Sequence, residues 1–359
     1  MFGPRIWLSA LTLYALVTLG VLLQGDSAAA PAADQPVVHS LTGGRPYCGV
    51  AIQLQRVDWV DKYKDLIDHI ASDGADTVSL VVDARQENFQ STFMYIDVRK
   101  TMSDAQLAEI IDHAKSRHLR VVLMPIVLLD DPNDTHWRGT LDPKDWHVWF
   151  ENYRDLIDHY AYIARDHDVD LLVVGSELVS SEEHLDEWVD TIKGIRDIYK
   201  GELTYSSNWD RYRKVKFWKY LDVIGMNSYW TLGEDRDVTV DQIKSNWSQI
   251  QKDIFPFLAE QNKPVILLEA GWCSLANAAK DPWDYTQTQL DADPDLQRKL
   301  YEGFFQSWWG RPDLAGFVLW AMDPNGDPDG RGYTPQGKPA EAVMRHWLAQ
   351  PRWDIMVSK

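Results

Sequence analysis

Two glutamates occupy matching positions in the sequence. Glu177 lies within VDLLVVGSELVS (residues 169–180), and Glu269 lies within PVILLEAGW (residues 264–272). Each follows a short apolar run rich in β-branched residues, which is typical of a strand buried on both faces. Because barrel enzymes place reactive groups where buried strands end, both glutamates are candidate catalytic residues. The alternative for Glu177 is a carboxylate that only stabilises the start of the helix after it.

The remaining sequence alternates predicted strands with predicted helices. Apolar runs indicate strands at residues 47–55, 76–84, 120–129, 169–177, 202–209, 222–230, 264–272 and 314–322. Helical patterns follow them at residues 58–72, 103–117, 144–166, 182–199, 214–220, 240–261, 294–309 and 338–348. Eight strands, each followed by a helix, predict an α/β fold, a single-domain (β/α)8 TIM barrel. A doubly wound sheet is the alternative, but its typical glycine-rich turn does not follow the first strand, VAIQLQ.

A barrel would bring the residues that follow its strands to one mouth. No histidine is among them, which argues against amidohydrolase-type metal sites and Ser/His triads. Tryptophan is abundant, with 17 in the chain, and flat indole faces suit the C–H-rich faces of sugars. Carboxyl groups beside aromatic rings therefore favour a carbohydrate site. Besides the two glutamates, the candidate site residues are Arg85, Ser176, Asn208, Trp209, Asn227, Tyr229, Trp230, Trp272 and Trp320.

This pattern resembles a known group of enzymes. Glu177 after the fourth predicted strand and Glu269 in the seventh resemble the glutamate pair of clan A retaining glycoside hydrolases. Tyr229 and Trp320, near the ends of the sixth and eighth strands, fit the same clan. The turns VGSEL and LLEAGW and the segment GYTPQGKPAEAVMRHW are most similar to glycoside hydrolase family 113, known for β-1,4-mannanase activity. The resemblance covers about residues 45–350.

The resemblance implies a role for individual residues. Glu177 would be the acid/base and Glu269 the nucleophile, so a raised pKa is expected for Glu177 and an ionised side chain for Glu269. Tyr229 would hydrogen-bond Glu269 and keep it oriented. Arg85 would stand near the nucleophile and lower the pKa of its carboxyl group.

Several of these residues have a structural alternative. Arg85 could instead form a salt bridge with Asp83 or Glu87, and each tryptophan could pack in the core or at the rim. Ser176 departs from the clan pattern, in which many members have Asn that donates to the sugar 2-hydroxyl. A serine hydroxyl could make this bond directly or through water, so the exact sugar stays open.

The residues and the resemblance together predict a retaining endo-β-1,4-mannanase. The alternatives are a retaining hydrolase or transglycosylase acting on another β-linked glycan, and a catalytically silent carbohydrate-binding barrel. No cofactor is expected. The loop DPNGDPDG (residues 323–330) fits the first half of a calcium loop, but Gln336 stands where the twelfth position needs Glu, so no metal is predicted.

The N-terminus predicts export. An arginine in MFGPR precedes an uncharged apolar stretch at residues 6–23, and small residues of the A-x-A kind follow near residues 28–30. Residues 1–30 are therefore a predicted signal peptide, with an uncleaved anchor as the alternative. Residues 31–44 would be a tether, 45–350 the barrel and 351–359 a C-terminal tail. The expected location is secreted, periplasmic or cell-surface, and membrane-anchored if the signal is uncleaved.

The composition limits the possible partners. A formal net charge of −18 argues against nucleic acid and anionic membranes and permits a neutral β-linked oligo- or polysaccharide. No protein partner is predicted, and a monomer is expected. Cys48 and Cys273 lie at opposite ends of the predicted barrel, so no disulfide is expected.

Overall fold

The barrel is present and closed. The computed structural model describes residues 44–133, 135–287 and 289–355. In these residues eight parallel strands pair in the order β1-β9-β8-β7-β6-β5-β4-β2, and β1 pairs with both β9 and β2. They are β1 (Tyr47–Gln53), β2 (Thr77–Gln86), β4 (Arg120–Leu129), β5 (Leu171–Ser176), β6 (Glu202–Ser207), β7 (Ile224–Asn227), β8 (Val265–Ala270) and β9 (Leu314–Leu319). The predicted (β/α)8 barrel is confirmed.

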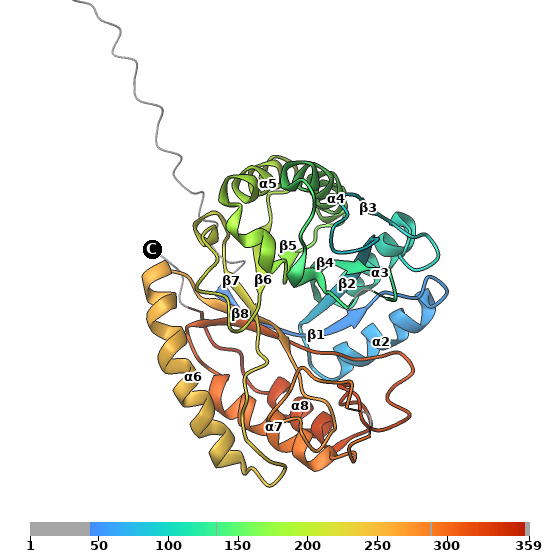
Figure 1. Ribbon diagram of the computed structural model, residues 1–359. Coiled ribbons are helices and arrows are strands. Elements are labelled where there is room, and N and C mark those ends of the chain that lie inside the picture. Colours follow the sequence, from blue (N-terminus) through green and yellow to red (C-terminus); the bar gives the residue numbers. More distant parts are fainter. Residues whose placement is uncertain (1–43, 134, 288, 356–359) are drawn as a thin grey trace, which may run out of the picture. The chain divides into compact units, whose positions relative to one another are not determined.

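Helices surround these strands (Figure 1). They are α2 (Val60–Ser72), α3 (Asp104–Ser116), α4 (Trp146–Asp166), α5 (Leu185–Ile198), α6 (Val240–Gln261), α7 (Pro294–Trp308) and α8 (Pro339–Leu348). Shorter 3-10 turns are η2 (Arg138–Thr140), η3 (Val179–Glu183) and η4 (Trp218–Tyr220), the last standing in place of a full helix after β6. A two-residue strand, β3 (Met94–Tyr95), pairs antiparallel with the end of β2.

Helix starts follow the sequence signals in one case and not in another. At α3, whose helical pattern was predicted from residue 103, Ser103 and Gln106 form a capping box. The helix predicted from residue 182 begins later, because α5 starts only at Leu185 and has no side-chain cap. Glu177 is therefore not in the first turn of α5, so the helix-start explanation for its carboxylate does not hold.

Apolar side chains fill the barrel and the layer between strands and helices. Alternate residues of one strand belong to different layers: Ile266 and Leu268 pack inside the barrel, whereas Val265 and Leu267 pack under the helices. Cys48 and Cys273 are both buried and free. None of the helices in the described residues is long and apolar enough to cross a membrane.

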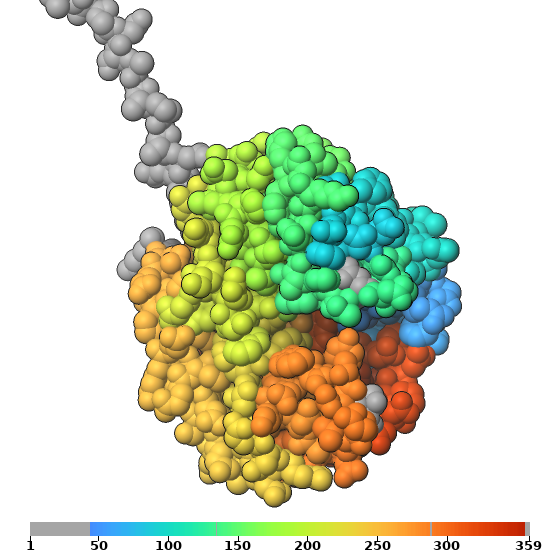
Figure 2. All heavy atoms as spheres, viewed as in Figure 1, coloured from blue at the N-terminus to red at the C-terminus, as the bar shows by residue number. Residues whose placement is uncertain are grey.

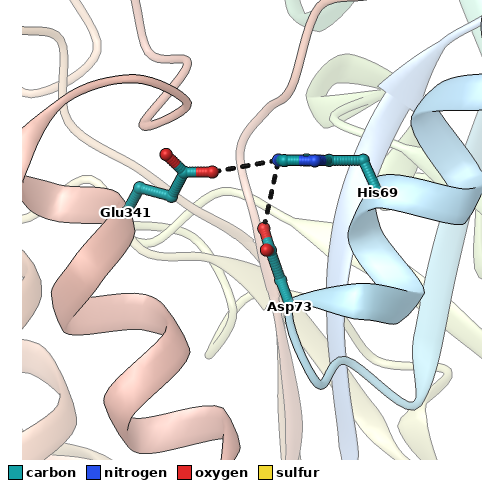
Figure 3. Close-up of side chains that lie close together, drawn as sticks. All are labelled: His69, Asp73 and Glu341. Carbon is teal, nitrogen blue, oxygen red and sulfur yellow. Dashed lines mark hydrogen bonds and ion pairs between the residues drawn. The ribbon is translucent and has the colours of Figure 1, made fainter.

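Two contacts join the two ends of the described chain. His69 of α2 and Asp73, directly after that helix, meet Glu341 from α8 (Figure 3), with His69 Nε2 2.9 Å from the Glu341 carboxylate. Arg345 pairs with the same two acids, at 2.5 Å from Asp73 and 3.0 Å from Glu341. This cluster therefore fixes the first barrel helix against the last.

The termini differ in how far the structure reaches. The predicted signal peptide and nearly all of the predicted tether lie outside the described residues. The first part of the predicted tail packs on the barrel: Trp353 donates from its indole nitrogen to the Leu314 carbonyl at 2.9 Å, and the Ile355 amide donates to Gly44 at 3.1 Å.

Candidate active site

Glu177 leaves the barrel on a tightly held turn. β5 ends at Ser176, and Glu177 has a φ of 55°, a left-handed conformation that is uncommon for residues other than glycine. Its amide donates to the Ser206 carbonyl at 2.8 Å. The next amide, of Leu178, donates to the Tyr205 hydroxyl at 2.9 Å. Such a conformation persists where its surroundings over-determine it, and it is typical of functional sites.

Another glutamate, Glu182, supports this turn through Tyr205. The Tyr205 hydroxyl, which receives the Leu178 amide, donates to Glu182 Oε1 at 3.0 Å. Glu182 is only 2% exposed. Burial raises its pKa to about 7, although the hydrogen bond from Tyr205 opposes this. A buried Glu182–Tyr205 pair thus holds the backbone that presents Glu177.

Glu269 is reached through an irregular stretch of β8. Strict alternation with Ile266 and Leu268 would turn Glu269 toward the helices. The pairing of β8 with β9 shifts register between Leu267 and Ala270, however, and this irregularity allows Glu269 to face the mouth. Glu269 is 4% exposed, and Tyr229 donates from its hydroxyl to Oε2 at 2.8 Å. This is the hydrogen bond that the sequence resemblance implied, while Oε1 accepts no hydrogen bond from the described residues.

Asn227 connects the two glutamates. Its backbone pairs with Glu269 across β7 and β8. Its side-chain nitrogen donates to Glu177 Oε1, and its side-chain oxygen accepts from the Trp209 amide at 2.7 Å. The amide orientation is therefore set from both sides. The structure thus brings Glu177, Glu269, Tyr229 and Asn227 into one site, as the barrel predicted.

Arg138 belongs to the same site and was not predicted. It lies in η2, in the segment between β4 and α4, and its Nη2 is 2.6 Å from Glu177 Oε2. Both side chains are largely buried, with 17% of Arg138 and 13% of Glu177 exposed. Arg138 therefore supplies a positive charge in direct contact with the Glu177 carboxylate.

The electrostatics of the pair differ from the expectation. Burial, followed by the charge of Glu177, raises the pKa of Glu269, while the charge of Arg138 and the hydrogen bond from Tyr229 lower it. An ionised side chain was expected for Glu269, and in the structure without substrate its pKa is raised instead, because the carboxyl group is buried beside Glu177 and has one neutral donor, Tyr229. The raised pKa expected for Glu177 stays a prediction.

Arg85 forms a salt bridge, which was the alternative to a place beside the nucleophile. Its Nε is 2.7 Å from Asp83, and its Nη1 is 3.4 Å from Asp130. Arg138, and not Arg85, is the cation whose charge lowers the pKa of Glu269. The expectation that Arg85 stands beside the nucleophile is therefore corrected.

The tryptophans divide into two groups. Trp272 is completely buried and packs against Tyr301 and Phe304, each with a ring-centroid distance of 5.6 Å. It therefore belongs to the core, and its prediction as a sugar-binding residue is wrong. Trp209 and Trp230 are partly exposed and meet edge to face at 5.9 Å. Trp320 is partly exposed directly after β9 and precedes a cis peptide bond.

Two small polar residues leave hydrogen-bonding atoms unused. Ser176 is 1% exposed, and its hydroxyl has no hydrogen-bond partner among the described residues. Asn208, directly after β6, is half-buried, and its Oδ1 likewise accepts no hydrogen bond within the described ranges. Both residues stay candidate contacts for sugar hydroxyl groups.

One group in the described residues has the composition of a metal site. It is the cluster of His69, Asp73 and Glu341, whose ligand atoms lie within 4.8 Å of one another (Figure 3). Arg345 already supplies a positive charge to both acids. The cluster joins α2 to α8 and includes neither glutamate of the candidate site, so we assign it a structural role.

Comparisons with known proteins agree with this geometry. No curated protein matches the chain. A solved GH113 β-1,4-mannanase is 25% identical, with a TM-score of 0.76 over 86% of this chain and 99% of its own. Another is 26% identical, with a TM-score of 0.76 over 86% and 100%. The GH113 β-mannanase AaManA from Alicyclobacillus acidocaldarius, in complex with ManMIm, is 24% identical, with a TM-score of 0.77 over 87% and 99%, and shows the shared fold.

The sequence itself carries the family assignment. Residues 51–329 match Glycoside Hydrolase Family 113. This range includes both glutamates, Tyr229 and Arg138, so the match covers the site as well as most of the barrel. The resemblance predicted from the strand ends is confirmed, and the chain belongs to glycoside hydrolase family 113.

Proposed function

We propose that the protein is a retaining endo-β-1,4-mannanase in which Glu177 is the acid/base and Glu269 the nucleophile. The observation that best supports this proposal is the position of Asn227, which pairs with Glu269 in the sheet and donates a hydrogen bond to Glu177. A retaining glycosidase needs two carboxyl groups about 5–5.5 Å apart across one sugar. The solved GH113 β-1,4-mannanases, at 25% and 26% identity, support mannan as the substrate.

The proposed first step uses each side chain once. A Glu269 oxygen attacks the anomeric carbon and forms a glycosyl ester, while the bond from that carbon to the glycosidic oxygen breaks. Glu177 gives its proton to the leaving oxygen. Tyr229 keeps Oε2 hydrogen-bonded, so Oε1, which has no partner within the described residues, is the oxygen left to attack.

The second step uses the same two glutamates. Glu177, now ionised, takes a proton from water, and the resulting oxygen nucleophile attacks the anomeric carbon. The ester bond to Glu269 breaks and releases its carboxylate. Arg138 and Asn227, which contact the Glu177 carboxylate, stabilise it while it acts as base.

The substrate preference is tested by polysaccharide comparison. Release of reducing ends from mannan, glucomannan, xylan and cellulose should be fastest with mannan. Ser176, in place of the usual Asn, favours a second candidate, a hydrolase or transglycosylase on another β-glycan. Faster cleavage of xylan or cellulose would select that candidate. Binding of mannan oligosaccharides without any cleavage would instead indicate a silent binding barrel.

The assignment of the two glutamates is tested by azide rescue. Glu177→Ala should still form the glycosyl-enzyme from aryl glycosides whose leaving group needs no proton, and should then stall. Azide, which needs no base, should release the intermediate as the β-glycosyl azide. Glu269→Ala should show no such β product. An α-glycosyl azide from Glu177→Ala, or rescue confined to Glu269→Ala with the α product, would contradict the assignment.

The remaining proposals concern the protein's surroundings. We expect a neutral β-linked mannan as its partner, a monomeric state and no protein partner, since the strongly acidic chain suits an uncharged ligand. Export by the N-terminal segment stays a prediction. Mass determination of the purified extracellular protein would decide between a cleaved signal and an anchor.

A further inference from the structure

Two exposed aromatic residues lie in the segment that follows the strand of Glu269. This segment joins β8 to α7 and carries Trp283 and Tyr285, which are 54% and 66% exposed. Exposed aromatic rings on single positions are ordinary. Their place here is unusual, because the segment begins directly after the strand that presents a candidate catalytic carboxylate.

A series of tyrosine rings runs from Glu269 to this segment. Tyr229 donates to Glu269, and its ring centroid is 6.4 Å from that of Tyr333. Tyr333, half-buried, is in turn 6.5 Å from Tyr285. We call Tyr229, Tyr333 and Tyr285 the tyrosine series. It is continuous from a buried carboxylate to a ring that is two-thirds exposed.

The outer end of the series is held in place by bonds to two other segments. The Tyr333 hydroxyl, in the segment between β9 and α8, donates to the Pro282 carbonyl at 2.8 Å. Thr231, after β7, donates to the Lys280 carbonyl at 2.8 Å. Next to Tyr285, the Asp284 carboxylate accepts from the Thr286 amide at 3.0 Å. A backbone segment held by such bonds before binding loses less freedom when a ligand stacks on its side chains.

The surface around the series suits a neutral ligand. Asp281 and Asp284 flank Trp283, and the chain has a formal net charge of −18, so anionic partners are disfavoured. In Figure 2 the orange part of the surface, which contains this segment, borders a recess.

We propose that Tyr285, with Tyr333 behind it, is an outer sugar-binding platform for mannose units beyond those that flank the cleaved bond. The inference rests on the proposed mannanase function. It adds a binding position for longer chains, which the pair of glutamates alone does not require. The ring of Tyr285 presents a flat face to the C–H groups of a sugar, and its hydroxyl can reach a sugar hydroxyl.

The test compares a long with a short substrate. For Tyr285→Ala, kcat/KM with mannohexaose should fall about 2- to 10-fold, the size expected for one lost aromatic contact. The value with an aryl β-mannoside, which has one sugar ring, should not change. Tyr285→Phe should keep most of the mannohexaose activity if the ring stacks, and Tyr285→Trp should do the same.

Tyr162→Ala is the matched control. Tyr162 is 48% exposed on α4, away from the segment between β8 and α7, so its removal should leave both substrates unaffected. The affinity of the inactive Glu269→Ala protein for mannohexaose, measured by calorimetry, should fall when Tyr285→Ala is added. This second measurement needs no turnover, so it separates binding from chemistry.

Several results would overturn the platform. Equal activity of Tyr285→Ala and wild type on mannohexaose would do so, and so would an equal loss on both substrates, which would indicate a disturbed Glu269. A change in oligomeric state of Tyr285→Ala, with unchanged mannohexaose kinetics, would assign the ring to protein contact instead. Failure of the wild type to cleave any mannan substrate would contradict the proposed function and is distinguishable from all of these.

Discussion

Arg138 should set the pH range in which the enzyme works. Its guanidinium lies 2.6 Å from Glu177, and its charge lowers the pKa of Glu269. In Arg138→Gln the Glu269 carboxyl group loses this cation and becomes harder to ionise. The acidic limb of the bell-shaped profile of kcat/KM, which reports ionisation of the nucleophile, should therefore move to higher pH.

The size of the shift follows from the geometry. Two unit charges about 4 Å apart interact by about 4 kcal/mol at an effective dielectric constant of 20, which corresponds to about 3 pKa units. Water screens part of this interaction, because 13% of Glu177 and 17% of Arg138 are exposed. An arginine beside a carboxylate lowers its pKa by about 1–3 units in proteins. We expect a shift of about 1–2 units for the acidic limb.

The assay is the pH dependence of kcat/KM for a soluble manno-oligosaccharide, with thermal unfolding as the check on folding. Arg154→Gln is the control, since Arg154 makes an Arg–Glu pair of similar burial with Glu187, at 2.8 Å, between α4 and α5. Its profile should match that of the wild type. An acidic limb that stays in place in Arg138→Gln, or that moves to lower pH, would refute the electrostatic role of Arg138.

Two further predictions concern Trp272 and Glu182, which are both buried. Trp272→Ala should lower the free energy of unfolding by about 3–5 kcal/mol, whereas Trp320→Ala should mainly lower kcat/KM for oligosaccharides. Denaturant titration measures the first effect and kinetics the second. Two variants that behaved alike in both assays would contradict this prediction. Burial raises the pKa of Glu182 from 4.5 to about 7, so wild-type stability should fall as pH rises through this interval, relative to Glu182→Gln, which keeps an acceptor for Tyr205. The difference in unfolding free energy between pH 5 and pH 8 should approach about 3 kcal/mol, and identical pH dependence of the two proteins would contradict it.

The fold was predictable because its signals are periodic. The strand at residues 120–129 and the helix at residues 240–261 have the observed bounds. Long apolar patterns determine which segments are buried, and alternating strands and helices leave few topologies. Glu177 and Glu269 followed from the same pattern, since each stands at the end of a buried run. Helix starts were less reliable, as the late beginning of α5 at Leu185 shows.

The errors in the site have a common physical cause. Arg138 lies in a segment between β4 and α4 with no repeating pattern, so nothing in its sequence indicated a contact with Glu177. Trp272 was placed at the mouth, yet near a strand end one residue of register decides which face a side chain takes. The irregular pairing of β8 that admits Glu269 to the mouth has the same origin. Contacts that come from loops or from register shifts are set only when the chain folds, so the sequence pattern does not indicate them.

The position of one proton within the glutamate pair explains how Glu269, whose pKa is raised in the free protein, can be ionised during the reaction. Repulsion between two buried carboxylates favours one shared proton, and each carboxyl group ionises more easily when the other is protonated. In the structure, Arg138 and Asn227 both contact the Glu177 carboxylate. This arrangement matches the second step of the proposed mechanism, in which Glu177 is the base and Glu269 is a neutral ester. The first step needs the proton on Glu177, and its arrival removes the charge that raises the pKa of Glu269. Burial alone then raises the pKa of Glu269, while Tyr229 and Arg138 lower it. Movement of one proton from Glu269 to Glu177 therefore ionises the nucleophile and protonates the acid in the same event.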